Sequence, residues 1–181
     1  FSIYNGLDFS HVVPKTDRAA YFAQFGYTVH EGDVIAGIAA RLDPVKDIPT
    51  LIRAVALAQK ACPQLRLAIA GEGMERKKLE ALAAELGIAD SVFFLGWVND
   101  LDSFYGALDI NTLSSLSEAF PYALPEGARA HLATVASNVG GVPAIIEHGV
   151  TGLLIEPGDV RMLAAYLARY ALDADYRHEM G

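Results

Sequence analysis

The order of apolar and polar positions predicts alternating strands and helices over most of the chain. Residues 34–40 form a continuous apolar run typical of a buried strand. A helical pattern follows over 48–61, where Leu51, Ile52 and Val55 recur at helical spacing. The same alternation continues toward the end of the chain. Further strands are expected at 65–70, 92–95, 110–113, 135–137 and 153–155, and further helices at 75–86, 101–107, 125–131, 143–148 and 159–171.

This alternation predicts one fold class. Strands joined by helices pair in parallel through right-handed crossovers, and helices then cover both faces of the sheet. We therefore expect an α/β protein with a single Rossmann-like domain over 34–181 and a six-stranded, mostly parallel sheet. Residues 1–33 lack the alternation and are interpreted as a linker with a short packing helix at 18–25. Ligands of such sheets bind beyond the carboxyl ends of the strands, so the residues after each strand are the candidates for chemistry.

Composition narrows the class of protein and its compartment. The 181 residues are 52% hydrophobic, which suits one domain with a complete core. The net charge of −8 argues against a broad nucleic-acid surface, which clustered Lys and Arg would form. A single cysteine, Cys62, favours a reducing, cytoplasmic compartment. No apolar run reaches the roughly 18 residues of a membrane span, and the sequence opens on Phe1 as if cut from a longer protein.

Two cations follow the first predicted strand. Arg41 and Lys46 stand five positions apart in a loop that leads into the helix expected from residue 48. The planar fork of an arginine and the point charge of a lysine suit the two phosphates of a diphosphate. Unpaired N–H groups at the helix start would add to such a site. Spacing alone also fits two surface cations among the fourteen Lys and Arg.

Two carboxylates follow the fourth predicted strand. Glu118 is expected in a loop and Glu126 in a helix, with seven residues between them. A loop carboxylate is suited to accepting hydrogen bonds from sugar hydroxyls, and a helical one to binding a ribose diol. Amides at the helix start suit phosphate oxygens. Spacing alone does not distinguish the two from ordinary solvated acids.

The remaining motifs are weaker. The run from Gly71 to Gly73 follows the second strand and has Arg76 in place of a third glycine, so a tight turn is favoured over a dinucleotide fingerprint. Gly140 and Gly141 predict a structural turn. The five histidines show no metal-ligand spacing, and no G-x-S-x-G motif supports an α/β-hydrolase.

In combination these segments resemble the C-terminal, donor-binding half of the group 1 retaining glycosyltransferases, which have the two-domain GT-B fold. Each segment alone is weak, and the resemblance rests on their order and spacing. The matching segments are 4–8 (the interdomain linker), 41–47 (the diphosphate segment), 70–73, 94–98 (beside the base), 118–126 (an E-x7-E element), 139–143 and 148–154.

The resemblance implies a role for each position. Arg41 and Lys46 would neutralise the donor diphosphate, and Glu118 would contact the donor sugar; these three are the implied catalytic residues. The implied nucleotide-binding residues are Gly71, Val98 through its backbone at the base, Ala119 and Phe120 through their amides, Leu124 through its N–H at phosphate, and Glu126 at the ribose.

The resemblance also implies the partners. They are a nucleotide-sugar donor, which serves in place of a cofactor or metal, and a preceding acceptor-binding domain that this chain lacks. Any peripheral attachment to a membrane would run through that domain. The acidic net charge separately argues against a nucleic-acid partner. The 181-residue piece alone is expected to be inactive or weakly active.

One departure from the family pattern is Pro125, where an aliphatic residue is usual. A proline inside a helix costs about 3 kcal/mol, so we predict that the helix begins at or near Pro125 or is kinked there. The same departure keeps open a degenerate domain with a binding or regulatory role. The sequence is also compatible with a nucleotide-sugar epimerase or a dehydrogenase, whereas a phosphorylase would require a pyridoxal-phosphate lysine, which no lysine here resembles.

Overall fold

Six strands form one sheet in the computed structural model, which describes residues 13–181. The strand order is β3-β2-β1-β4-β5-β6, and every neighbouring pair is parallel. The direction of winding therefore reverses between β1 and β4, as in a Rossmann-like sheet. The predicted fold class is confirmed. The strands are β1 Val34–Ala39, β2 Leu65–Ala70, β3 Val92–Gly96, β4 Ile110–Leu113, β5 Ala133–Ser137 and β6 Leu153–Ile155.

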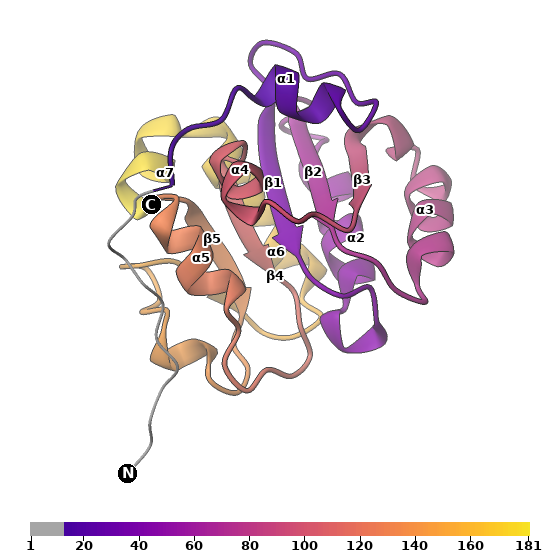
Figure 1. Ribbon diagram of the computed structural model, residues 1–181. Helices are drawn as coiled ribbons and strands as arrows, with labels where there is room; N and C mark the ends of the chain where they lie inside the picture. Colours follow the sequence, from indigo (N-terminus) through magenta and orange to yellow (C-terminus); the bar gives the residue numbers. More distant parts are fainter. Residues whose placement is uncertain (1–12) are drawn as a thin grey trace.

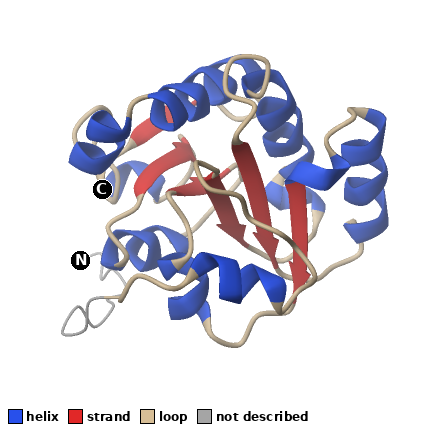
Figure 2. Cartoon of the chain, turned by 90° about the horizontal axis from the view of Figure 1, so that it is seen from above, coloured by secondary structure: helices blue, strands red, loops and turns tan. Residues whose placement is uncertain are grey.

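Helices cover both faces of this sheet (Figures 1 and 2). The largest hydrophobic cluster lies between the sheet and α2, α3 and α6, and a second cluster lies beneath α1 and α4. The first contains the apolar stripe predicted for 48–61, with Leu51, Ile52 and Val55 fully buried. The helices are α1 Arg18–Ala23, α2 Ile48–Ala58, α3 Arg76–Glu85, α4 Leu101–Gly106, α5 Ala123–Arg129, α6 Val160–Leu172 and α7 Ala174–Met180, and the 3-10 turns are η1 Pro44–Lys46, η2 Ala89–Ser91 and η3 Val142–Ala144.

The helix predicted at 143–148 is wrong, because only the single turn η3 forms there. Side chains in the next segment accept backbone hydrogen bonds in place of helical carbonyls. Thr151 Oγ1 accepts from the N–H of Glu147, and His148 Nδ1 accepts from the N–H of Leu154, both at 2.9 Å. Such local bonds compete with a helix and end it.

The sequence pattern also missed α7. This helix follows α6 after one residue, Asp173, whose carboxylate accepts a 2.9 Å hydrogen bond from the N–H of Tyr176. An aspartate at the N-cap satisfies one of the unpaired amides at a helix start. That residue is the signal that predicts the second helix.

The packing helix expected at 18–25 corresponds to α1. Arg18 donates to both carboxylate oxygens of Asp109, at 3.0 and 2.9 Å, and the N–H of Ile35 donates to the same carboxylate at 2.8 Å. Asp109 and Ile35 lie where β4 and β1 begin. The helix is therefore attached at the amino ends of these strands, opposite the edge where ligands bind. The predicted linker segment 4–8 lies outside the described residues.

Candidate functional site

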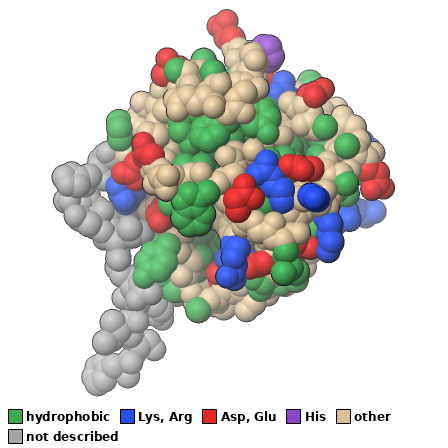
Figure 3. All heavy atoms as spheres, turned by 45° about the vertical axis from the view of Figure 1, so that its right-hand side comes forward, with side chains coloured by type: hydrophobic (Ala, Val, Ile, Leu, Met, Phe, Trp, Pro, Cys, Tyr) green, Lys and Arg blue, Asp and Glu red, His purple; other side chains and the backbone are tan. Residues whose placement is uncertain are grey.

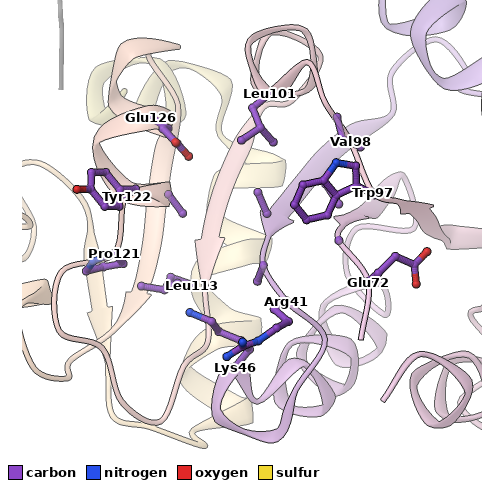
Figure 4. A pocket seen from close by; sticks show the side chains of 15 residues that line it. Arg41, Lys46, Glu72, Trp97, Val98, Leu101, Leu113, Pro121, Tyr122 and Glu126 are labelled. Atoms are coloured by element: carbon purple, nitrogen blue, oxygen red, sulfur yellow. The ribbon is translucent and has the colours of Figure 1, made fainter. Parts of the chain in front are cut away.

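A cavity of about 460 Å³ opens at the carboxyl ends of the central strands (Figure 4). It spans the point between β1 and β4 where the strand order reverses, which is where α/β sheets bind their ligands. The lining is contributed by the ends of β1 to β4, by the turn η1 and by the starts of α4 and α5. The lining residues are Ala39, Ala40, Arg41, Lys46, Ala70, Gly71, Glu72, Trp97, Val98, Leu101, Leu113, Pro121, Tyr122, Ala123 and Glu126.

An ion pair joins the loops on the two sides of this reversal. Lys46 Nζ lies 2.6 Å from Glu118 Oε1, and the hydroxyl of Ser115 donates to the same oxygen at 2.6 Å. The side chains of Lys46 and Glu118 are 21% and 10% exposed. Their attraction is therefore less screened than that of a surface pair. The structure thus places a cation and a carboxylate from different loops in direct contact at the cavity.

Backbone contacts hold the same two loops together. The N–H of Leu116 donates to the carbonyl of Val45, and the hydroxyl of Ser114 donates to the carbonyl of Lys46, both at 2.8 Å. Directly after Lys46, Asp47 takes a left-handed conformation with φ of 43°, and α2 begins at Ile48. The backbone of Lys46 is therefore held by hydrogen bonds from the loop after β4 and by the start of α2 that follows it.

Arg41 lies beside Lys46 at one end of the cavity, as Figure 4 shows. Its side chain is 76% exposed, and its Nε donates to the carboxylate of Asp43. The guanidinium therefore lies at the solvent side of the site, whereas Lys46 is more enclosed. Two positive charges five residues apart thus converge on one end of the cavity.

Glu126 extends from α5 toward the other part of the cavity (Figure 4). Its Oε2 accepts a 3.0 Å hydrogen bond from the hydroxyl of Tyr105, which is itself buried. Burial, together with the negative charge of Glu126, raises the pKa of Tyr105 well above its usual value. The phenol therefore stays protonated and donates to the carboxylate.

Pro125 is the third residue of α5. The first turn of a helix has amides without helical partners, so a missing N–H costs little there. The prediction that the helix begins near Pro125 is confirmed.

Three glycines allow close approach of the loops that carry the site. A Cβ at Gly71 would overlap the carbonyl oxygen of Ala40, and a Cβ at Gly140 would overlap that of Glu118. Gly141 follows and donates its N–H to the carbonyl of Glu118 at 3.3 Å. The N–H of Gly71 donates to the carbonyl of Gly96 at 2.7 Å. These glycines therefore shape the loops through close packing. Gly140 and Gly141 lie in a turn as predicted, whereas residues 71–73 do not.

Two aromatic side chains, Trp97 and Tyr122, line the cavity. Trp97 is 75% exposed, and its Nε1 donates to Asn99 at 2.9 Å. Tyr122 lies on the opposite side of the cavity (Figure 4). Sequence reasoning assigned no role to either ring or to Tyr105. For Trp97 the available signal was an aromatic residue directly after the third strand.

Not every candidate from the sequence lines the cavity. Five of them do: Arg41, Lys46, Gly71, Val98 and Glu126. Glu118 lies outside the lining but forms an ion pair with Lys46, which is part of it. The residues Ala119, Phe120 and Leu124 do not belong to the lining. Leu124 is buried and its N–H donates to the carbonyl of Pro121 at 3.3 Å, while the ring of Phe120 packs edge-on against Tyr122. The roles expected of these three amides stay predictions.

Basic and acidic side chains lie interspersed on the face shown in Figure 3. Arg76, which stands where a third glycine would be, donates to Glu72 at 2.9 Å and to Glu80 at 2.7 Å. It also donates to the carbonyl of Phe94 at 3.2 Å. This arginine links α3 to β3, and it holds Glu72 at the edge of the cavity.

Residues 13–181 contain neither a metal cluster nor a membrane-spanning helix. No group of three or more His, Cys, Asp or Glu in that range is arranged to hold a metal ion. No helix there has both the length and the apolar character of a membrane span.

The fold and the position of the cavity identify the class of this protein. It is a Rossmann-like α/β domain of the kind that forms one half of a GT-B enzyme. The family follows from comparison with known proteins. A model described as "Glycosyl transferases group 1" matches residues 22–181. The chain belongs to this family.

The chain is similar in sequence to curated glycosyltransferases. The chain is 31% identical to D-inositol 3-phosphate glycosyltransferase of Corynebacterium jeikeium, over 97% of its own length and 44% of the relative. The chain thus spans less than half the length of this curated relative.

Solved structures show the same relation. HepE of Anabaena, crystallised in complex with UDP, matches with a TM-score of 0.86 and 29% identity, over 98% of this chain and 49% of HepE. The C-terminal domain of the group 1 protein LpcC from Francisella tularensis matches with a TM-score of 0.83 and 26% identity, over 97% of this chain and 92% of that domain. The structure therefore corresponds to about half of HepE and to nearly all of the C-terminal domain of LpcC.

Proposed function

We propose that this chain is the donor-binding domain of a retaining glycosyltransferase and that its cavity binds a UDP-sugar. One observation carries the proposal: Arg41 and Lys46 from the loop after β1 and Glu126 from α5 line one cavity at the sheet reversal, where Lys46 pairs with Glu118 from the loop after β4. HepE, which shares this fold at 29% identity, has been crystallised with UDP and with UDP-glucose. No cofactor beyond the donor itself enters the proposed reaction.

In the proposed complex, Arg41 and Lys46 bind the diphosphate. The charge on the leaving phosphate grows as the glycosidic C–O bond breaks, and fixed cations stabilise that charge most in the transition state. Lys46 is the more enclosed of the two. We therefore assign it the larger share of this stabilisation.

The carboxylates bind the sugars in this proposal. Glu118 accepts hydrogen bonds from the donor sugar, held in place by Ser115 and Lys46. Glu126 accepts them from the ribose, and the backbone of Val98 contacts the base. Retention of configuration follows if the acceptor oxygen bonds to the anomeric carbon on the face from which the diphosphate departs. The departing diphosphate can take the acceptor proton on that face.

The acceptor site is assigned to a preceding domain. Such a domain would close over the cavity and exclude water from the reacting bond. We propose that the 181-residue chain binds donor nucleotide but transfers sugar weakly or not at all by itself.

Replacing Arg41 by Ala tests the diphosphate assignment. We expect UDP affinity to fall about three- to tenfold, a modest loss because the guanidinium is exposed and a solvated ion pair contributes little. Isothermal titration calorimetry measures the change. Arg53→Ala is the matched control, because Arg53 is exposed on α2 outside the cavity lining. Equal affinities for wild type and Arg41→Ala would contradict the assignment.

The degenerate-domain hypothesis loses its main support. It rested on Pro125 distorting the helix that carries Glu126, but the proline occupies the first turn of α5, where a proline is tolerated. Glu126 lies next along the helix and lines the cavity. The geometry therefore favours a site that binds the donor over a degenerate one.

A further inference from the structure

The hydroxyl of Tyr105 lies in the protein interior next to the cavity. Tyr105 is on α4 and is 1% exposed. Its single described polar partner is Oε2 of Glu126 on α5, at 3.0 Å. A buried hydroxyl that lost this acceptor would be left without a hydrogen bond, which is unfavourable. The bond therefore constrains the carboxylate as well as the phenol.

The two oxygens of Glu126 have different surroundings. Oε2 is held by Tyr105, whose raised pKa keeps the hydroxyl proton in place as the donor. No hydrogen bond within residues 13–181 involves Oε1, and Glu126 lines the cavity (Figure 4). One oxygen is thus occupied by the protein and the other is presented to a ligand.

We propose that Tyr105 is a positioning residue for the nucleotide: it holds Oε2 of Glu126 so that Oε1 accepts hydrogen bonds from the ribose hydroxyls. This inference rests on the proposed function, because it takes Glu126 to be the ribose ligand. Tyr105 itself contacts no ligand. It acts by fixing the orientation of the carboxylate before the nucleotide arrives.

A fixed carboxylate is the better ligand for a physical reason. A glutamate side chain has several rotatable bonds, and ordering it on binding costs conformational entropy. A carboxylate already ordered by Tyr105 avoids much of that cost. Loss of the phenol hydroxyl should therefore weaken binding of ribonucleotides selectively, leaving nucleotides without the ribose hydroxyls little affected.

The test compares UDP with 2′,3′-dideoxy-UDP by calorimetry on wild type and Tyr105→Phe. We expect wild type to prefer UDP by about tenfold, and Tyr105→Phe to prefer it by about threefold or less. Tyr170→Phe is the matched control. Tyr170 is also fully buried, but its hydroxyl donates to the carbonyl of Thr134 at 3.4 Å, so its removal should leave the wild-type preference unchanged.

A second variant keeps the test independent of the folding of Tyr105→Phe. In Glu126→Gln the single amide oxygen remains with Tyr105, and the amide NH2 group faces the ribose. The NH2 group cannot accept the hydrogen bonds that the ribose hydroxyls donate, so the preference for UDP should fall to about threefold or less. Retention of the wild-type preference in either variant overturns the inference.

Two further outcomes separate the inference from the proposed function. If wild type binds neither nucleotide, the proposed function fails and the inference with it. If wild type binds both nucleotides equally, the cavity binds a diphosphate but Glu126 does not select ribose, and only the inference is overturned.

Discussion

Replacing Lys46 by Ala is expected to weaken UDP binding about ten- to a hundredfold, because a hydrogen bond to a charged phosphate contributes about 1.5–3 kcal/mol. Lys46 is the more enclosed of the two cations at the end of the cavity that we propose for the diphosphate. Titration calorimetry measures the loss. Lys60→Ala, which removes an exposed lysine outside the cavity lining, is the control and should bind UDP as wild type does.

The same substitution should also lower stability. Without Lys46, the carboxylate of Glu118, whose side chain is only 10% exposed, keeps the hydroxyl of Ser115 as its polar partner, at a cost of about 1–3 kcal/mol. Adding Glu118→Gln removes the uncompensated charge. The double variant is therefore expected to recover stability in chemical denaturation without recovering UDP affinity. A Lys46→Ala variant that binds UDP within about threefold of wild type would refute the diphosphate assignment.

Replacing Gly140 by Ala is expected to lower the free energy of unfolding by about 2–5 kcal/mol, the sum of a left-handed conformation and overpacking. Gly140 has φ of +49°, and a Cβ there would overlap the carbonyl oxygen of Glu118. Backbone cannot rotate out of the way as a flexible side chain can. The loop that carries Glu118 must shift, so UDP affinity should fall together with stability.

Gly149→Ala provides the control for this substitution. Gly149 also has positive φ, +80°, but no atom lies within 4 Å of its Cβ position. Its replacement should cost only the conformational part, about 1–2 kcal/mol, and leave UDP affinity unchanged. Chemical denaturation measures the stability of the two variants, and calorimetry measures their UDP affinity. Together they separate the cost of the left-handed conformation from the cost of the clash with Glu118. Equal losses of stability in both would show that the approach of Gly140 to Glu118 is unimportant.

The sequence predicted the fold and the loops of the site, but not the contacts within it. Parallel strands have their carboxyl ends at one edge of a sheet, so Arg41, Lys46 and Glu126 were expected along that edge. Their common role at one ligand came from the resemblance to the family. The direct pair of Lys46 with Glu118 depends on the paths of two loops 72 residues apart. The contact of Tyr105 with Glu126 depends on how α4 packs beside α5. Periodicity carries no information on either.

Chemistry of single side chains explains the remaining differences. The helix expected at 143–148 failed because Thr151 and His148 accept backbone hydrogen bonds locally. Pro125 proved compatible with a helix because of its position in the first turn. Both depend on where a residue falls within an element, which hydrophobic periodicity locates only to within a few residues.

Amide chemical-shift mapping on the ¹⁵N-labelled chain during titration with UDP tests the assigned cavity most directly. Saturable shifts are expected to concentrate in residues 40–47, 97–98 and 114–126, which form the loops around the cavity. The amino ends of the strands, where Arg18 binds Asp109, should stay unchanged. Shifts confined to that opposite edge, or no saturable shifts at all, would contradict the assignment of this cavity as the donor site.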